Sequence, residues 1–464
     1  MVEELKKSLR HSAAARWTTM AVVAFTMLCG YYVADVVAPL KPLIEKQLHW
    51  NSEQYGFFTS AYAWFNVFLF MLVLGGMILD KMGPRFAGML ATILMVIGCG
   101  VKWYAMSTQS LAQYTLVGQN AQVMVAALGF ALFGVGIELC GITATKIISR
   151  WFKGYEIALA MGLQVAIARI GTGIALGASA PLAKAFGHVS APVLGGALLL
   201  GVGLVAFLFY IGMDKKLDAS EGAEKSDVSE DGFRLADIKE ILSNRGFWLI
   251  AILCALFYSG VFPFLKYATD LMVQKFHVSE EYAGLIPSML PFGTMILTPV
   301  FGRIYDKKGK GATIMVLGSL LIMAVHVVFA LPFLTHWLVA VGAMLLLGVG
   351  FSLVPSAMWP SVPKMIPHRQ LGTAYALIFY LQNLIALMAV PYLVGFVLNR
   401  YSATKTVVNG KTVVSYDYTL PMLIFVACGV LAVVVAFLLR AADKKGGYGL
   451  ELPNQTDDKE AETA

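Results

Sequence analysis

Two opposite charges, Glu138 and Arg169, lie inside long apolar stretches of the sequence. Each is about fifteen residues from the polar turn 151–155 that joins the two stretches, so two transmembrane helices would place both at the same depth, near the bilayer midplane at ~1.5 Å of rise per residue. A charge at that depth usually faces water or binds something. A guanidinium can grip a carboxylate with two hydrogen bonds and a carboxylate can bind an ammonium, so the pair could hold a zwitterion.

The composition requires a membrane environment. Of the 464 residues, 58% are hydrophobic and 14% charged, whereas a soluble domain carries ~25% charged residues. The net charge of +7 would suggest nucleic acid for a soluble protein, but membrane topology explains it here, so we expect a lipid bilayer and no nucleic acid as partner. The five cysteines lie in apolar stretches and match no metal site. With no phosphate loop or nucleophile triad either, we expect no metal, no cofactor and no enzyme.

Hydropathy predicts an all-α, polytopic membrane protein with about twelve transmembrane helices in two six-helix bundles. The predicted spans lie near residues 17–40, 54–79, 86–106, 120–149, 155–185, 191–213, 246–272, 282–303, 312–332, 336–360, 370–398 and 418–440. A polar stretch, with helical spacing around 233–238, separates the bundles. The predicted domains are an N-terminal bundle (1–213), a cytoplasmic linker (214–245), a C-terminal bundle (246–440) and a cytoplasmic tail (441–464).

The basic residues predict the orientation. Most of the 35 Lys and Arg residues fall in the two tails and in the loops on the same side as the tails. Because cytoplasmic loops carry an excess of Lys and Arg, we expect both termini to be cytoplasmic.

The two halves repeat a short loop motif. Residues 76–85 and 302–310 both fit Gly-x-x-x-Asp-Lys-x-Gly, and Gly-Val-Gly at 134–136 recurs at 348–350. A tight turn at Gly83 would let Asp80 cap or pair with neighbouring helix ends and lock the cytoplasmic side. Two related halves around a cavity are typical of alternating-access carriers. The candidate gating residues are Gly76, Asp80, Lys81, Gly83, Arg85 and Asp306.

The first of these loops is the signature of the major facilitator superfamily, which the sequence resembles over its whole length. Asp35 and Tyr62-Ala-Trp64 resemble the lysosomal dipeptide-transporter branch of that superfamily. Further segments from both halves do so too: residues 149–156, 161–164, 168–171, 258–264, 359–360, 367–375 and 382–384. The resemblance implies that Glu138 and Arg169 bind the two ends of a dipeptide, and that transport is facilitated uniport. We expect a bacterial homologue.

Several other residues are candidates for the same site, each with a structural alternative. Asp35 could gate or line the vestibule, or be a rim charge, and Tyr62, Tyr258 and Trp359 could form its walls or simply pack. Gln382 and Asn383 could bind peptide amides or join two helices. Glu138 and Arg169 could themselves form a salt bridge between adjacent helices. We expect Lys266 and Asp270, one helical turn apart, to neutralise each other.

Other functions stay open. If Glu138 carries a proton, transport would be proton symport. Arg169 could instead bind a small organic or inorganic anion, although Glu138 would repel it and the matching position of the second half, about Asn383, is neutral. A non-transporting sensor or assembly partner has the least support.

The tails suggest a location. Neither tail shows acidic residues ahead of a paired Leu or Ile, which is the type of sorting signal that the organellar relatives need. The glycosylation triplet Asn454-Gln455-Thr456 lies in the predicted cytoplasmic tail. We therefore expect a plasma membrane, most simply a bacterial inner membrane, and a monomer without a glycosylated accessory subunit.

Overall fold

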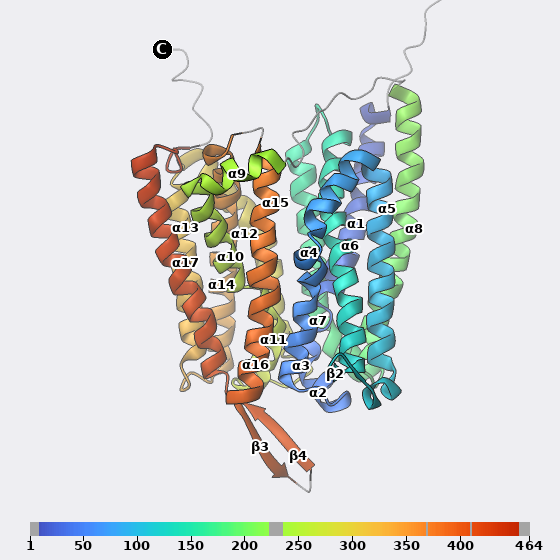
Figure 1. Cartoon of the computed structure of the whole chain (residues 1–464), viewed down its shortest axis with the longest axis vertical. Coiled ribbons are helices and arrows are strands. Elements are labelled where there is room, and N and C mark those ends of the chain that lie inside the picture. Colours follow the sequence, from blue (N-terminus) through green and yellow to red (C-terminus); the bar gives the residue numbers. More distant parts are fainter. Residues whose placement is uncertain (1–8, 222–234, 368–369, 409–410, 454–464) are drawn as a thin grey trace, which may run out of the picture. The chain divides into compact units, whose positions relative to one another are not determined.

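The computed structural model describes residues 9–221, 235–367, 370–408 and 411–453 (Figure 1). Eleven helices in these ranges are long and apolar enough to cross a membrane, which confirms the predicted all-α class. Parts of the predicted linker (222–234), of the 367–375 segment (368–369) and of the tail (from Asn454) lie outside the described residues.

The chain forms two compact units. The first comprises Met1–Val37, Ala61–Ala175 and Leu182–Gly232, and the second comprises Ala38–Ser60, Leu176–Pro181 and Phe233–Ala464. Most of each unit comes from one half of the sequence, but Ala38–Ser60 belongs with the second half. The predicted domain boundaries stay a prediction.

The first unit is a bundle of long helices. Its elements are η1 (Leu9–His11), α1 (Ala13–Asp35), η3 (Ala61–Ala63), α4 (Trp64–Phe68), α5 (Met71–Ser107), η4 (Gln109–Gln113), β1 (Thr115–Leu116), β2 (Gln119–Asn120), α6 (Ala121–Trp151), most of α7 (Ile157–Ala185) and α8 (Ser190–Glu221). β1 and β2 form a short antiparallel hairpin between α5 and α6.

The second unit is also a helical bundle, with shorter pieces between its long helices. Its elements are η2 (Ala38–Leu40), α2 (Lys41–Gln47), α3 (Ser52–Ser60), α9 (Leu235–Ser243), α10 (Arg245–Ser259), α11 (Phe262–Gln274), α12 (Leu285–Lys308), α13 (Gly311–Ala330), α14 (Trp337–Met365), α15 (Leu371–Gln382), the π-helix η6 (Asn383–Ala389), α16 (Val390–Tyr401), β3 (Ala403–Val408), β4 (Lys411–Tyr416) and α17 (Thr419–Gly446). β3 and β4 form an antiparallel hairpin between α16 and α17.

The second predicted span is the most irregular. It runs through α3, η3 and α4, reaches Phe70 in the left-handed region (φ 52°), and continues into α5. With 37 residues, α5 would be about 55 Å long, well beyond the ~30 Å of a bilayer core. Gly83 (φ 79°) divides it. The helix thus joins the end of the second predicted span to the third, which reconciles eleven helices with about twelve crossings.

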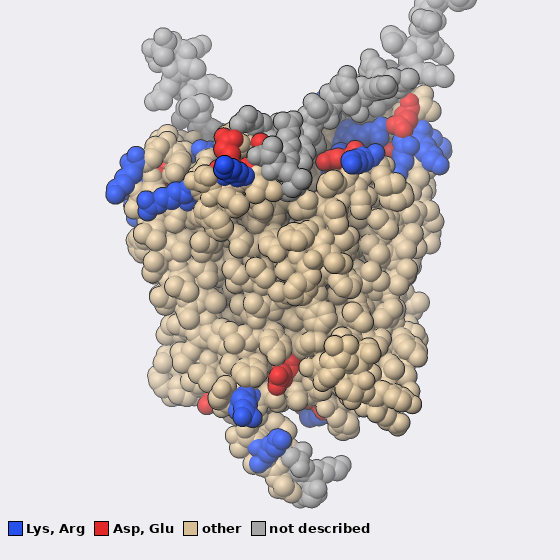
Figure 2. Space-filling model, in the orientation of Figure 1, with Lys and Arg blue, Asp and Glu red and all other residues tan. Residues whose placement is uncertain are grey.

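Charges follow the helix ends. On the face shown in Figure 2, Lys, Arg, Asp and Glu side chains gather over the ends of the helices and leave the middle uncharged. Within the second unit, α9 contacts α10 and α15 and lies across their ends (Figure 1). The predicted helical segment of the linker therefore contains a helix from Leu235 onward.

The segment after α17 folds back onto the second unit. Residues 447–453 follow α17, and the backbone N–H groups of Lys310 and Gly311 donate to the carbonyls of Glu451 and Leu450, both at 2.9 Å. The Glu451 carboxylate accepts from the backbone N–H of Thr313 at 2.8 Å, in the first turn of α13. It satisfies a helix-end donor that has no partner within the helix. Leu450 is fully buried.

Close backbone contact joins α5 to α6 in the first unit. A Cβ atom on Gly98 would lie 2.5 Å from the backbone nitrogen of Phe133, and one on Gly129 would lie 2.6 Å from that of Lys102. Such distances are below van der Waals contact, so the two helices pack through glycine. Small residues are the usual means of close helix contact in membranes, where lipid leaves little hydrophobic drive for association.

This seam gives a stability prediction. Gly98→Ala should lower the free energy of unfolding by about 1–3 kcal/mol because the added methyl overpacks the α5–α6 contact. Gly100→Ala is the matched control, since a Cβ there meets no atom within 4 Å. Thermal unfolding in detergent should show a lower midpoint for Gly98→Ala alone. Equal midpoints for the two variants would contradict the seam.

Candidate functional site

The surroundings of Glu138 depend on a glycine one helical turn earlier on α6. A Cβ on Gly134 would lie 2.0 Å from the carbonyl oxygen of Tyr62, so only glycine lets η3 approach α6 this closely. Because residues four apart share a helix face, Glu138 lies beside the same segment. The Tyr62 hydroxyl donates to Glu138 Oε1 at 2.9 Å, and its ring packs edge-on against Phe130, one turn before Gly134.

A second glycine sets the position of Arg169 on α7. A Cβ on Gly171 would lie 2.2 Å from the carbonyl oxygen of Leu28, so α7 and α1 are in backbone contact. Next to this contact, Thr172 Oγ1 donates to Asp35 Oδ2 at 2.8 Å. The end of α1 is thereby tied to the helix that carries Arg169.

These groups form one electrostatic cluster in the first unit. Tyr31 on α1 lies within electrostatic range of Arg169, Glu138 and Asp35, and Tyr62 lies within range of Glu138, Tyr31 and Asp35. All five side chains are partly exposed rather than sealed in the core. We did not predict Tyr31 from sequence, although it shares a helix face with Asp35. The cluster therefore contains both anionic and cationic groups.

The predicted residues of the second unit form an aromatic group. Trp359 Nε1 donates to the Tyr258 hydroxyl at 3.3 Å, and the Trp359 ring packs at 5.2 Å from Phe379 and 6.0 Å from Tyr375, centroid to centroid. The Tyr258 ring stacks on Phe262 at 5.0 Å. Tyr258 is buried and Trp359 is partly exposed.

Gln382 and Asn383 lie where α15 passes into the π-helix. Both are buried, and the Gln382 side-chain oxygen accepts a hydrogen bond from Cys254 Sγ at 3.7 Å. Asn383 Nδ2 donates to the Phe379 carbonyl at 3.0 Å, while its Oδ1 atom is buried without a hydrogen-bond partner. Buried amides are normally satisfied, and π-helical turns are frequent at functional sites.

The first motif loop connects α5 with its neighbours. Gly83 adopts a positive φ of 79°, which requires glycine, whereas Gly76 has open space where a Cβ would be. Asp80 pairs with Lys146 of α6 at 2.8 Å. Lys81, next to it, is exposed.

Arg85 belongs to a larger ion network. Its guanidinium and that of Arg150 both bind Asp214, at 2.6 and 3.0 Å, and both also bind Asp218. The Trp151 indole donates to Asp214 at 2.9 Å. The network joins α5, α6 and α8 at one end of the first unit, and its acidic half was not predicted from sequence.

The remaining predicted residues lie in the repeated loop and in the seventh predicted span. Asp306 lies near the end of α12, three residues before Gly309, which has a φ of 66°. Asp270 is ion-paired with Lys41 at 2.6 Å, and both side chains are fully buried, whereas the expected neutralisation of Asp270 by Lys266 stays a prediction. A lysine from a distant segment reaches Asp270 because Ala38–Ser60 packs in the second unit.

Among the described residues, no group of three or more His, Cys, Asp or Glu side chains could hold a metal ion. The fold defines a multi-pass helical membrane protein. The sequence pattern of the Major Facilitator Superfamily matches residues 22–391, and the chain belongs to this family.

Two relatives and one solved structure show which individual proteins this chain resembles. The lysosomal dipeptide transporter MFSD1 of Mus musculus is 27% identical over 445 residues, which cover 92% of this chain and 87% of that protein. The probable sulfoacetate transporter SauU of Cupriavidus necator is 24% identical over 389 residues, covering 77% and 83%. In fold, the chain is similar to the crystal structure of a bacterial homolog of the human lysosomal transporter Spinster, with a TM-score of 0.68, 12% identity and coverage of 93% and 98%.

The ion network gives a second prediction. Asp214→Asn should destabilise the protein by about 2–3 kcal/mol, because it removes the fully buried carboxylate that holds two guanidinium groups. Asp218→Asn is the control and should cost less than about 1 kcal/mol, since Asp218 is 48% exposed. Thermal unfolding in detergent measures both. A larger loss for Asp218→Asn would refute this account of the network.

Proposed function

We propose that this protein transports dipeptides, with Arg169 binding the carboxylate end and Glu138 the ammonium end. The observation that carries the proposal is the cluster of the first unit, in which both groups are partly exposed and share one electrostatic environment with Tyr31. A zwitterion presents the complementary pair of charges. The likeness to the mouse dipeptide transporter over 92% of the chain supports the same substrate class.

The neighbours of Glu138 and Arg169 fit this role. Tyr62 donates to one carboxylate oxygen of Glu138 and so fixes its orientation, leaving the other oxygen for an ammonium. Asp35, held by Thr172, adds a second anionic group to the cluster. Backbone contacts at Gly134 and Gly171 hold the binding groups on rigid helices, which limits the entropy lost on binding.

We further propose that Tyr258, Trp359, Gln382 and Asn383 contact the side chains and the amide of the peptide. Aromatic faces accept side chains of many shapes, so they would allow broad selectivity. The unpartnered Oδ1 of Asn383 is an acceptor suited to a peptide N–H.

The transport cycle that we propose is alternating access by facilitated uniport. The motif loop, with Asp80 bound to Lys146, and the Arg85 network would lock one side, with the repeated loop at Asp306 as its counterpart. Proton symport is the alternative, with Glu138 as proton carrier. We place the protein as a monomer in a bacterial inner membrane, with cytoplasmic termini and no accessory subunit.

A small-anion transporter is the second candidate. It is favoured by the likeness to the probable sulfoacetate transporter and by Arg169 as a cationic group. Glu138 weighs against it, because a carboxylate in the same cluster would repel an anion. Thermal-shift measurements with dipeptides, amino acids and organic anions separate the two, since a ligand of the folded state raises the unfolding midpoint.

Substitution of Arg169 tests the substrate contact. Arg169→Ala should abolish dipeptide uptake into proteoliposomes, and Arg169→Lys should retain only a small part of it, because an ammonium cannot grip a carboxylate with the same paired geometry. Lys184→Ala, at the end of the same helix, is the control and should transport normally. Uptake at the level of the unaltered protein by well-folded Arg169→Ala would exclude the proposed site.

A pH gradient tests the energetics. Uniport predicts equal initial uptake rates with and without an imposed proton gradient, and no accumulation above the external dipeptide concentration. Glu138→Gln should weaken dipeptide binding in either case, because it removes the charge that holds the ammonium. Gradient-driven accumulation that Glu138→Gln abolishes would replace uniport by proton symport.

A further inference from the structure

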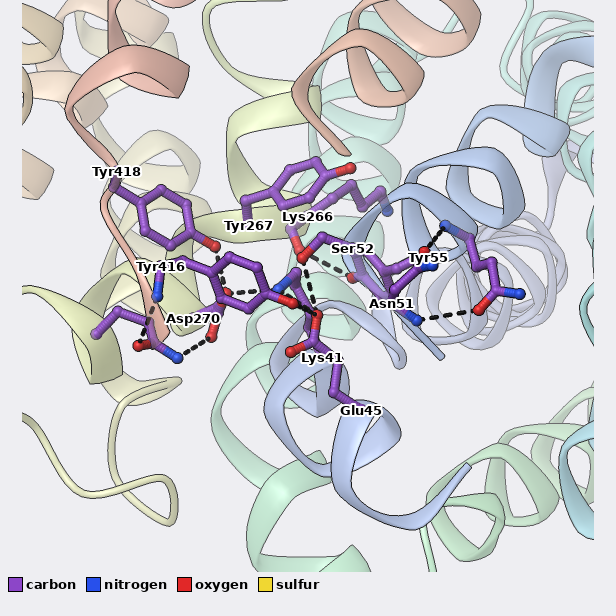
Figure 3. Close-up of polar contacts among 12 residues, drawn as sticks. Lys41, Glu45, Asn51, Ser52, Tyr55, Lys266, Tyr267, Asp270, Tyr416 and Tyr418 are labelled. Carbon is purple, nitrogen blue, oxygen red and sulfur yellow. Dashed lines mark hydrogen bonds and ion pairs between the residues drawn. The ribbon is translucent and has the colours of Figure 1, made fainter. Parts of the chain in front are cut away.

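A buried ion cluster in the second unit contains none of the proposed binding residues. Lys41, the first residue of α2, binds Asp270 of α11 at 2.6 Å and Glu45 of its own helix at 2.8 Å (Figure 3). Lys41 and Asp270 are fully buried, and Glu45 is 15% exposed. Replacing such a pair by apolar residues is often neutral or stabilising, so stability alone does not explain it.

Hydroxyl groups complete the cluster. The Tyr418 hydroxyl donates to Asp270, whose other oxygen accepts from Gln274 at 3.4 Å. Tyr416 and Ser52 donate to Glu45 Oε1 at 3.1 and 2.8 Å. Burial raises the pKa of the Tyr416 hydroxyl to about 12, so it stays protonated and remains a donor.

A glycine contact lies next to the cluster. A Cβ on Gly56 of α3 would lie 2.9 Å from the Pro391 carbonyl oxygen, and one on Gly395 of α16 would lie 2.8 Å from the Gly56 Cα. The Tyr267 hydroxyl, from α11, donates to the same Pro391 carbonyl at 2.6 Å. The contacts that hold the segment 38–60 to α11 and α16 thus include the Lys41–Asp270 ion pair and this glycine contact. They also include hydrogen bonds from the Tyr55 hydroxyl to the Lys266 carbonyl at 2.8 Å and from the Asn399 amide to Glu53 at 3.2 Å.

Lys41 and Asp270 each have a further partner on their own side of the contact. If α2 and α11 separated, the Lys41 ammonium would keep Glu45, four residues away on α2. Asp270 would keep Tyr418 and Gln274, which follow it on the other side of the contact. Neither charge would be left alone, which removes most of the cost of breaking a buried ion pair.

We propose that Lys41 and Asp270 form a releasable latch, which holds the segment 38–60 to α11 and opens during transport. The segment 38–60 joins the first two spans of the first sequence half, while α11 and α16 belong to the second half. In a cycle in which each sequence half moves as one body, the movement breaks this contact. The inference rests on the alternating-access cycle proposed above, but on no particular substrate.

A buried reporter cysteine can measure opening. Ser60 lies one turn beyond Gly56 on the same face of α3 and is 3% exposed. Ser60→Cys would be introduced after replacement of the five native cysteines, and its reaction with a polar maleimide followed in nanodiscs without substrate. Because nanodiscs expose both faces, the result does not depend on orientation.

The latch predicts opposite effects for neighbouring variants. Lys41→Met and Asp270→Asn should each speed labelling about fivefold or more, because the closed state loses its ion pair. Glu45→Gln should slow labelling, since the released ammonium would lose its remaining partner. Lys46→Met, which removes the exposed pair with Glu280, is the matched control and should leave the rate unchanged.

Other results would overturn the latch. A cluster that only stabilises the fold would label faster in every variant that removes a contact, including Glu45→Gln. Unchanged labelling in Asp270→Asn, which preserves the side-chain volume, would also exclude it. If Lys41→Met does not fold, Asp270→Asn and Glu45→Gln still test the two opposite effects on the labelling rate. If the labelling results contradict the latch while Arg169→Ala abolishes dipeptide uptake, the latch is excluded and the proposed function stands.

Discussion

The bilayer core offers no water to solvate a charge, and this constraint explains where the ionisable groups of this protein lie. Lys102 illustrates it. The side chain is fully buried in α5, and its ammonium donates to the Val33 carbonyl at 3.0 Å and lies 4.7 Å from the centre of the Phe130 ring. A carbonyl and an aromatic face together replace part of its hydration. Glu138 and Arg169, by contrast, stay partly exposed, as the proposed binding of an exchangeable ligand requires.

Glycines at close backbone contacts determine where these ionisable groups lie. Gly134 brings Tyr62 onto Glu138, and Gly171 brings α1 against the helix of Arg169. Gly136 and Gly350, equivalent in the internal repeat, lie at crossings of α6 with α5 and of α14 with α13, where a Cβ would be 2.7 and 3.2 Å from a backbone oxygen. The repeat is therefore conserved between the halves as a packing position. Groups held by backbone contact move little, so the proposed site would be largely formed before a ligand arrives.

Local patterns could be predicted from the sequence. Hydropathy indicated the helices, and the motif at residues 76–85 indicated a turn that the positive φ of Gly83 realises. Partners distant in sequence could not be predicted: Asp270 has Lys266 one turn away, yet it pairs with Lys41, 229 residues distant. Periodicity also could not indicate the left-handed Phe70 or the π-helix at Asn383, because a hydrophobic period does not encode a local change of backbone conformation.

The docked end of the chain bears on how the protein can be handled. A fluorescent protein or affinity tag joined directly to Gly446 would remove Glu451 from the first turn of α13 and leave the backbone N–H of Gly311 without its acceptor. The pocket that holds Leu450 would open to solvent, next to Lys364, whose ammonium donates to the carbonyls of Gly449 and Leu452 at 3.1 Å. A fusion that begins beyond residue 453 keeps these contacts, so the junction decides whether the reporter disturbs the protein it is meant to follow.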